Sequence, residues 1–324
     1  MLSWKNARWT FHVFHSDPDH RMIVALKYWL LALRPKTLSI SVIPVITGSA
    51  LGWLQGGNLS VPVLLVALLV SLLIQVGTNL HNDAADAVSG TDNPATRLGP
   101  PRAVAQGWLS ARSVKRAARS TFLLAFFIGL YLVSVGGWPI LLLGLLSIAA
   151  GYLYSGGPWP VARSATGESF VLFFFGVVAV SGSAYLQAGR FSAAAVLCGL
   201  LLGLPAAAVL VINNHRDREN DARAGRQTLA VRYGERLSQR LYIVGVLGPF
   251  ALLPLLQWMS VDAPIGYLPW LLLPWAIRLI VRFARIDKAQ DFNPLLAETA
   301  LFQFVLGMLL SLAFVVGGGL LVAH

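Results

Sequence analysis

The sequence predicts an all-α protein, a polytopic membrane helix bundle of about nine transmembrane helices around a central cavity. The first reason is composition: 56% of the 324 residues are hydrophobic, 12% are charged, and the mean hydropathy is +0.67. In an ordinary soluble domain about a quarter of the residues are charged. The second reason is that apolar runs of roughly 20 residues, long enough to cross a bilayer, recur along the chain.

Nine candidate spans account for most of the chain. They lie at about 37–54, 61–80, 118–136, 138–154, 169–187, 192–213, 238–258, 266–283 and 295–322. The third and fourth are short and are separated only by Gly136 and Gly137, so they form either two spans or one re-entrant unit. Prolines within or beside the spans, such as Pro44, Pro205 and Pro254, predict kinks that open a cavity between helices.

The net charge of +11 raises the question of a nucleic-acid partner. The basic residues fall in alternate loops, however, and the loops between them carry almost none, with Arg190 the exception. This is the positive-inside pattern. It predicts a multi-pass protein of the plasma (inner) membrane, surrounded by lipid, with its N-terminus in the cytoplasm and its C-terminus outside. No nucleic-acid partner is expected.

The chain divides into a polar and aromatic N-terminal extension, residues 1–27, and one integral-membrane domain, residues 28–324. The extension lacks the apolar core and cleavage site of a signal peptide. Trp4 and Trp9 favour an anchor at the membrane surface. The alternative is that Met22 is the true start.

Two acidic clusters stand out, because they hold six of the 14 Asp and Glu residues. The first motif comprises Asn82, Asp83, Asp86 and Asp92, and the second comprises Asp217 and Asp221. Each follows a long apolar run, and spacings of three and four residues place side chains on one helix face. Carboxylates there are costly unless a cation lies between them, and oxygen ligands suit Mg²⁺, which often binds phosphate as well.

Basic residues near the clusters predict that the metal binds a diphosphate. These are Arg34, Lys36, Arg97, Arg102 and Arg226. The chain has no P-loop, so a nucleotide is not indicated. A diphosphate on an apolar tail fits a kinked hydrophobic bundle better. The structural alternative is that the acidic residues only pair with Arg97 and Arg102 at a helix end.

These residues resemble the UbiA superfamily of membrane aromatic prenyltransferases, over roughly residues 28–320. The pattern Asn-Asp-x-x-Asp-x₃-Gly-x-Asp occurs at Asn82, Asp83, Asp86, Gly90 and Asp92, followed by Arg-Leu-Gly-Pro at 97–100. This spacing is most similar to the 1,4-dihydroxy-2-naphthoate prenyltransferases of menaquinone synthesis.

Further segments resemble the family. They are Arg34-Pro35-Lys36-Thr37-Leu38, Tyr154-Ser155-Gly156-Gly157-Pro158, and the second loop from Asn213 to Arg232.

The resemblance implies transfer of a polyprenyl group from polyprenyl diphosphate to the naphthoate, an aromatic acid. The ring loses its carboxylate, and the products are demethylmenaquinone and diphosphate. The implied cofactor is Mg²⁺, with Mn²⁺ as a substitute. The implied metal ligands are Asn82, Asp86, Asp92, Asp217 and Asp221, and the implied catalytic residues are Asp83, Asp86, Asp92, Asp217 and Asp221. The implied diphosphate contacts are Lys36, Asn82, Arg97, Arg102, Tyr154 and Arg226.

Two departures bear on the acceptor. The residue after the Asn-Asp pair is Ala84 where this subgroup has an aromatic residue, and the Gly-Leu-Gly-Glu of the subgroup reads Ala165-Thr166-Gly167-Glu168. Another aromatic acceptor, such as 4-hydroxybenzoate, therefore stays an alternative. So does a haem O or chlorophyll type of prenyltransferase, and, in a different class, a multi-span transporter.

Overall fold

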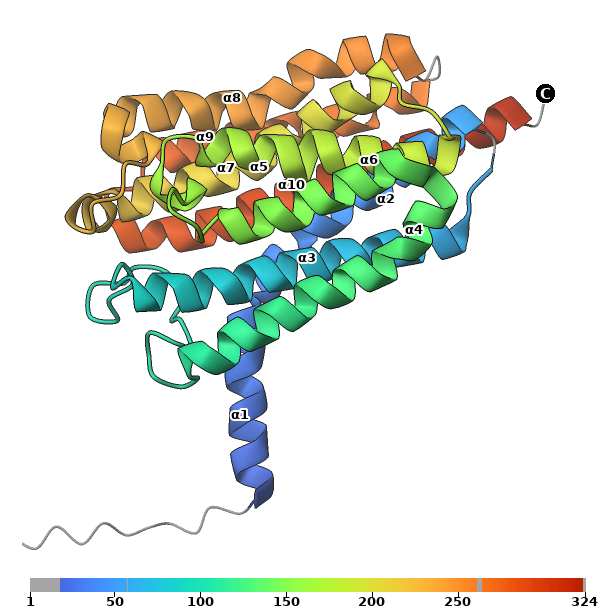
Figure 1. Ribbon diagram of the computed structural model, residues 1–324. Helices are drawn as coiled ribbons and strands as arrows, with labels where there is room; N and C mark the ends of the chain where they lie inside the picture. Colours follow the sequence, from blue (N-terminus) through green and yellow to red (C-terminus); the bar gives the residue numbers. More distant parts are fainter. Residues whose placement is uncertain (1–17, 57, 261–263, 323–324) are drawn as a thin grey trace, which may run out of the picture.

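A computed structural model describes residues 18–56, 58–260 and 264–322. Within these residues all regular structure is helical, and the long helices that follow residue 38 run roughly parallel or antiparallel to one another (Figure 1). The long elements are α1 (Pro18–Leu33), α2 (Ser39–Gly56), α3 (Val61–Val88), α4 (Ala111–Leu153), α6 (Ala179–Ala188), α7 (Ala193–Arg223), α8 (Leu229–Ser260), α9 (Leu273–Ala284) and α10 (Phe292–Val322). The short elements are η1 (Pro35–Thr37), η2 (Val161–Arg163), α5 (Gly167–Val171), η3 (Leu172–Val178), η4 (Pro264–Leu272) and η5 (Ala289–Asp291).

The predicted fold class is confirmed. Seven helices in the described part of the chain are long and apolar enough to cross a membrane, and the bent pair Leu26–Thr37 and Ser39–Gly56 makes eight. The bend in this pair is 49°. The protein is therefore a multi-pass membrane protein.

The helix α4 is in fact a hairpin of two legs. Its backbone is non-helical at Gly137, with φ 67° and ψ −157°. A Cβ atom placed on Gly151 would lie 3.1 Å from the Phe122 ring, which is possible only if the second leg runs back along the first. The predicted spans 118–136 and 138–154 are these two legs. Counting them separately raises the eight spans of the described residues to nine.

Small residues let the central helices approach closely. A side chain at Gly176 on η3, a π-helical segment, would overlap the backbone of Gly199 and Gly203 on α7. Gly48 and Gly52 on α2 pack in the same way against α6. Lipid provides no hydrophobic drive for helix association, so close backbone packing of this kind holds membrane helices together. The helix α7 lies at the centre of the bundle, with 78% of its most apolar stretch buried.

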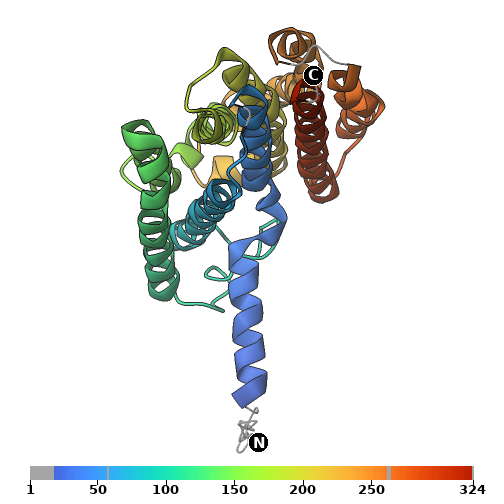
Figure 2. The same cartoon turned by 90° about the vertical axis from the view of Figure 1, so that its right-hand side faces the viewer.

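The helix α1 leaves the bundle and runs across the direction of the other helices (Figures 1 and 2). The chain turns at Arg34, which has left-handed backbone angles of φ 54° and ψ 64°. Pro35 disfavours a helical Arg34, so α1 and α2 cannot form one straight helix. The predicted domain boundary after residue 27 lies within α1, and residues 1–17 of the predicted extension lie outside the described residues.

Candidate functional site

A cavity of about 630 Å³ lies inside the bundle. Apolar side chains from α2, α3, the α4 hairpin, η3 and α6 line most of it, including Val45, Ile74, Leu143, Phe174 and Leu186. One end is polar, because the last turns of α3 and α7 and the loop after α3 meet there. We call residues 89–110 the first-motif loop.

The first motif is built on the last turns of α3, where Asn82, Asp83 and Asp86 are all buried. Gly90 follows with φ 71°, a left-handed angle that lets the chain reverse beyond α3. The Thr91 hydroxyl donates to the Asp86 carbonyl at 3.2 Å. The reversal brings Asp92 back beside the helix, where it shares Arg102 with Asp86.

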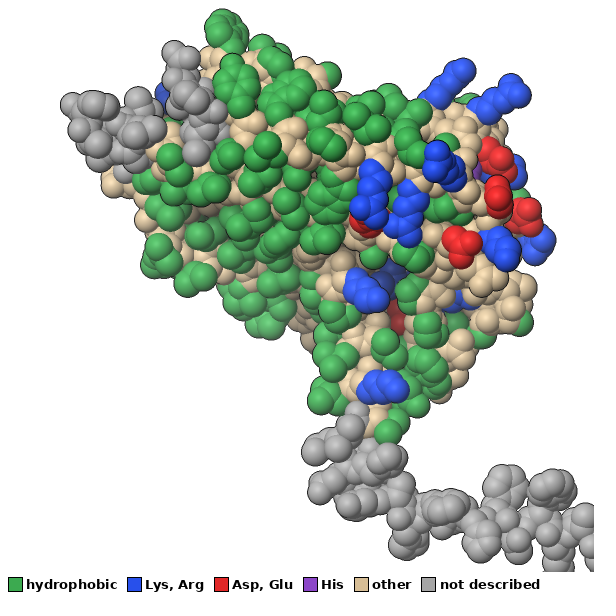
Figure 3. Space-filling view, turned by 180° about the vertical axis from the view of Figure 1, so that it is seen from behind, with side chains coloured by type: hydrophobic (Ala, Val, Ile, Leu, Met, Phe, Trp, Pro, Cys, Tyr) green, Lys and Arg blue, Asp and Glu red, His purple; other side chains and the backbone are tan. Residues whose placement is uncertain are grey.

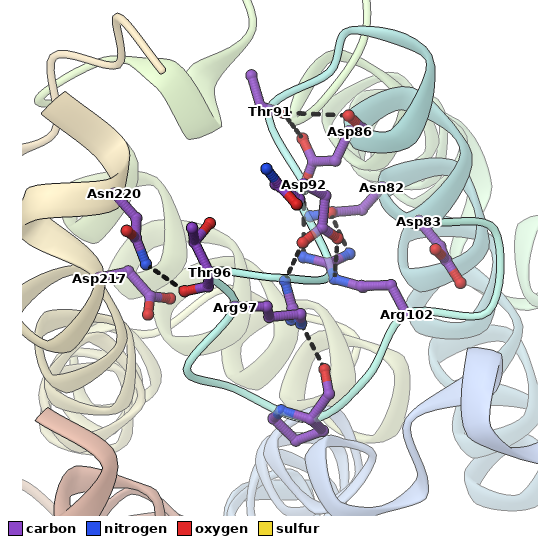
Figure 4. Close-up of polar contacts among 12 residues, drawn as sticks. Asn82, Asp83, Asp86, Thr91, Asp92, Thr96, Arg97, Arg102, Asp217 and Asn220 are labelled. Carbon is purple, nitrogen blue, oxygen red and sulfur yellow. Dashed lines mark hydrogen bonds and ion pairs between the residues drawn. The ribbon is translucent and has the colours of Figure 1, made fainter. Parts of the chain in front are cut away.

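Asp83 has a different environment from its neighbours. Its carboxylate accepts hydrogen bonds from the backbone N–H groups of Ala103 and Val104, at 3.2 and 3.4 Å. Figure 4 shows it pointing away from the cluster that Asp86 and Asp92 form. Asp83 therefore holds the first-motif loop against α3. Its predicted catalytic role is not supported by any contact with that cluster.

Arginines pair with the carboxylates of Asp86 and Asp92 (Figure 4). Asp92 binds Arg97 at 2.5 Å and Arg102 at 3.1 Å, and Arg102 also donates to Asn82 at 2.7 Å. Asp86 binds Arg102 at 3.3 Å. Burial raises the pKa of the Asp92 carboxyl, although Arg97 opposes this.

Arg226 connects the two motifs. Its guanidinium lies 2.8 Å from Asp86 on α3 and 3.4 Å from Asp221 on α7. Burial alone would lower the pKa of Arg226, but the two carboxylates outweigh it and raise the pKa. Two segments 140 residues apart in sequence are thus held across the end of the cavity by one cation.

Asp217, the other member of the second motif, is held by its neighbour Arg216. Both carboxylate oxygens accept from the guanidinium, at 2.9 and 2.6 Å. Arg216 is buried and also donates to Asn213 at 2.8 Å and to Asn293 on α10 at 2.6 Å. It therefore fixes the orientation of Asp217 and ties α7 to α10.

The same network reaches the first-motif loop. Asn293 donates to the carbonyl of Leu98 at 2.8 Å, and Asn220 donates to the carbonyl of Thr96 at 2.7 Å. A Cβ atom on Gly99 would lie 2.9 Å from the Arg216 guanidinium. Because glycine has no side chain, the first-motif loop can pack directly against Arg216. The sequence predicted no role for Arg216 or Asn293. Two signals pointed to Arg216: it lies in the family-like segment from Asn213 to Arg232, and it immediately precedes Asp217.

The other predicted diphosphate contacts also line the cavity. They are Lys36 on η1 and Tyr154 at the end of α4. Arg34 lines it as well, and its buried Nη2 has no hydrogen-bond partner among the described residues. The structure thus brings together at one cavity all the residues predicted to contact the diphosphate, Arg34 among them.

The site's fit to a divalent metal can be judged from its donors. Among the described residues, no three His, Cys, Asp or Glu side chains converge on one metal position. Arginines bind the carboxylates instead, as the structural alternative predicted for Arg97 and Arg102. The position of Arg226 between Asp86 and Asp221 nevertheless shows that the facing motifs hold a positive charge. Carboxylate and amide oxygens are also the ligands that Mg²⁺ takes in proteins.

Residues 41–306, most of the chain, match the UbiA prenyltransferase family. The chain belongs to this family. It is 38% identical over 296 residues to 1,4-dihydroxy-2-naphthoate octaprenyltransferase of Escherichia coli (strain K12), a match that covers 89% of this chain and 94% of that protein. It is 34% identical over 283 residues to the enzyme of that name from Mycobacterium tuberculosis (strain ATCC 25618 / H37Rv), covering 86% and 93%.

Solved structures of the family share the fold. A UbiA homolog from Archaeoglobus fulgidus bound to GPP and Mg²⁺ has a TM-score of 0.64 at 16% identity, over 92% of this chain and 100% of that one. A homolog from Aeropyrum pernix K1 in the apo state also gives 0.64, covering 86% and 97%. Family membership identifies the protein as a prenyl-transferring membrane enzyme, and the transporter interpretation is set aside.

Proposed function

We propose that this enzyme transfers a polyprenyl group from polyprenyl diphosphate to 1,4-dihydroxy-2-naphthoate, with loss of the ring carboxylate as carbon dioxide. The observation that carries this proposal is the 38% identity to a naphthoate octaprenyltransferase over 94% of that protein. The alternatives with other aromatic acceptors lack such support, because three relatives at 32–38% identity have the naphthoate in their names.

The polar end of the cavity suits the diphosphate. We assign Asn82, Asp86 and Asp92 on one side, and Asp217 and Asp221 on the other, as oxygen ligands for Mg²⁺. When bound, the metal supplies positive charge that makes diphosphate a better leaving group. Asp83 is assigned instead to positioning the first-motif loop.

The basic residues act on the same diphosphate. Arg97, Arg102 and Arg226 lie at the mouth of the cavity, where their guanidinium groups donate to carboxylates. A diphosphate offers these groups stronger bidentate acceptors. Binding of metal to the carboxylates would release the arginines toward the phosphate oxygens. Lys36 on η1 and Tyr154 at the end of α4 also line the cavity, and they provide further hydrogen-bond donors for the diphosphate.

The apolar part of the cavity holds the prenyl tail and excludes water. As the carbon–oxygen bond to diphosphate breaks, the allylic carbon becomes electron-poor. The electron-rich ring carbon that carries the carboxylate then forms the new carbon–carbon bond. The carboxylate leaves the same carbon as carbon dioxide, and the electron pair of the broken bond restores the aromatic ring. Aromatic side chains such as Phe170 and Phe174, whose ring centroids are 4.6 Å apart, shield the developing cation from hydrolysis.

Product analysis tests the proposal. Membranes that contain the protein receive a polyprenyl diphosphate, Mg²⁺ and either 1,4-dihydroxy-2-naphthoate or 4-hydroxybenzoate. We expect prenylated product and released carbon dioxide from the naphthoate only, and no product after chelation with EDTA. Prenylation of the benzoate alone, with its carboxylate retained, would show that the acceptor is wrong. Full turnover in EDTA would show that the metal assignment is wrong.

A further inference from the structure

A second hollow lies on the outside of α9, away from the central cavity. It has a volume of about 500 Å³ and is formed almost wholly by this one helix. Three of its lining residues are basic: Arg278, Arg282 and Arg285. We call this hollow the α9 groove.

The groove has a charged stripe and an apolar stripe side by side. The arginines are four and three residues apart, so they share one face of α9. Pro274, Ile277 and Val281 are three and four residues apart and form the neighbouring stripe, and they also line the groove. The opposite face of α9 is buried in the core, so the groove opens outward from the bundle.

The charges in the groove are not balanced by protein groups. Arg282 pairs with Glu298 on α10, and Glu298 also accepts a hydrogen bond from the Trp275 indole at 3.0 Å. Arg278 and Arg285 are exposed, and neither forms an ion pair with another described residue. Like charges spaced this way on a helix repel one another, and an anion bound between them removes the repulsion. The groove therefore has two uncompensated guanidinium groups beside an apolar surface.

The groove lies near one end of a segment that is long and apolar enough to span a membrane. Arg278 belongs to a segment, Gly266–Ala284, that is apolar enough to span a membrane. Phe283, near the end of the helix, packs against His215, which adjoins Arg216, so this end of α9 is level with the aspartate motifs. On the face shown in Figure 3 hydrophobic side chains cover most of the surface, while Lys and Arg gather toward one end.

We propose that the α9 groove binds an anionic phospholipid of the leaflet at the end that carries the aspartate motifs. Arg278 and Arg285 hold the headgroup phosphate, and an acyl chain lies along Pro274, Ile277 and Val281. Guanidinium groups match the geometry of phosphate oxygens, and basic pockets at this depth select anionic headgroups over zwitterionic ones. Because Arg282 already forms an ion pair with Glu298, the headgroup phosphate binds the other two arginines.

Native mass spectrometry of the full-length protein in detergent tests the proposal. The probe is an equimolar mixture of phosphatidylglycerol and phosphatidylcholine with the same acyl chains. We expect the wild-type protein to retain phosphatidylglycerol about tenfold better than phosphatidylcholine, and Arg278→Gln/Arg285→Gln to lose this preference.

The matched control is Arg112→Gln/Arg116→Gln. These arginines are also exposed, but they lie on α4, on the opposite side of the molecule from α9 (Figure 2). The control removes the same charge and should keep the preference. If the double α9 variant is not monodisperse, Arg285→Gln alone, beyond the end of α9, makes the same test.

Three results would overturn the proposal. The α9 variant could keep the wild-type preference, or the control could lose it equally, which would mean that only overall charge matters. Displacement of the lipid by the same concentration of glycerol 3-phosphate would show that the site takes soluble phosphate esters and that the acyl groove adds nothing.

Discussion

At the scale of single residues, Arg216 is the group on which the second motif depends. It donates to both oxygens of Asp217 and to Asn213 and Asn293. A lysine keeps the positive charge but cannot make these planar contacts together. In metal sites, loss of a partner that orients a ligand typically reduces affinity or activity by about 10–100-fold.

We therefore expect Arg216→Lys to lower prenyl transfer by about tenfold or more and to raise the Mg²⁺ concentration needed for half-maximal activity. Titration of activity in isolated membranes against Mg²⁺ measures both. The control is Arg218→Lys on the same helix, where the arginine makes only a surface ion pair with Glu235. Equal Mg²⁺ requirements in the two variants would contradict an orienting role for Arg216.

At the scale of elements, the α4 hairpin depends on Gly137. Its angles, φ 67° and ψ −157°, lie in a region that is essentially restricted to glycine. A Cβ atom there would contact only Pro139, at 3.8 Å, which is an ordinary van der Waals distance. A side chain at this position would therefore destabilise the fold through backbone strain and not through a steric clash.

Gly137→Ala should lower the free energy of unfolding by about 1–3 kcal/mol. Thermal unfolding in detergent measures the change. Gly144→Ala, in the second leg of the same hairpin, is the control, because it has helical geometry and open space around its Cβ position. This control should be neutral or slightly stabilising. Equal destabilisation by both substitutions would mean that the turn is not strained.

At the scale of the whole molecule, the distribution of charge predicts the orientation in the membrane. The first-motif loop follows α3 at one end, and residues 58–60 precede α3 at the other. The positive-inside rule places the first-motif loop in the cytoplasm. Labelling can test this, because Cys198, the natural cysteine of the chain, is buried.

An impermeant maleimide should label Asn58→Cys in intact spheroplasts and Ala95→Cys only after the membrane is opened. Both positions are exposed. Labelling of Ala95→Cys from outside, with Asn58→Cys protected, would reverse the topology and would place both aspartate motifs on the far side.

The helical membrane class, the positions of the spans and the residues at the polar end of the cavity could all be predicted from the sequence. Apolar runs and charge alternation are local properties of the chain, and lipid leaves few alternatives to a helix bundle. The spacing of Asn82, Asp86 and Asp92 likewise predicted that these side chains would lie close together.

The partner of each polar group, in contrast, depends on the tertiary structure. Asp83 and Asp86 are three residues apart, yet one binds backbone N–H groups of the first-motif loop and the other binds Arg102 and Arg226. Contacts such as Arg216 with Asn293 join residues 77 positions apart. Hydrogen bonds and ion pairs of this length depend on how helices pack and where loops return, and local sequence patterns do not contain that information.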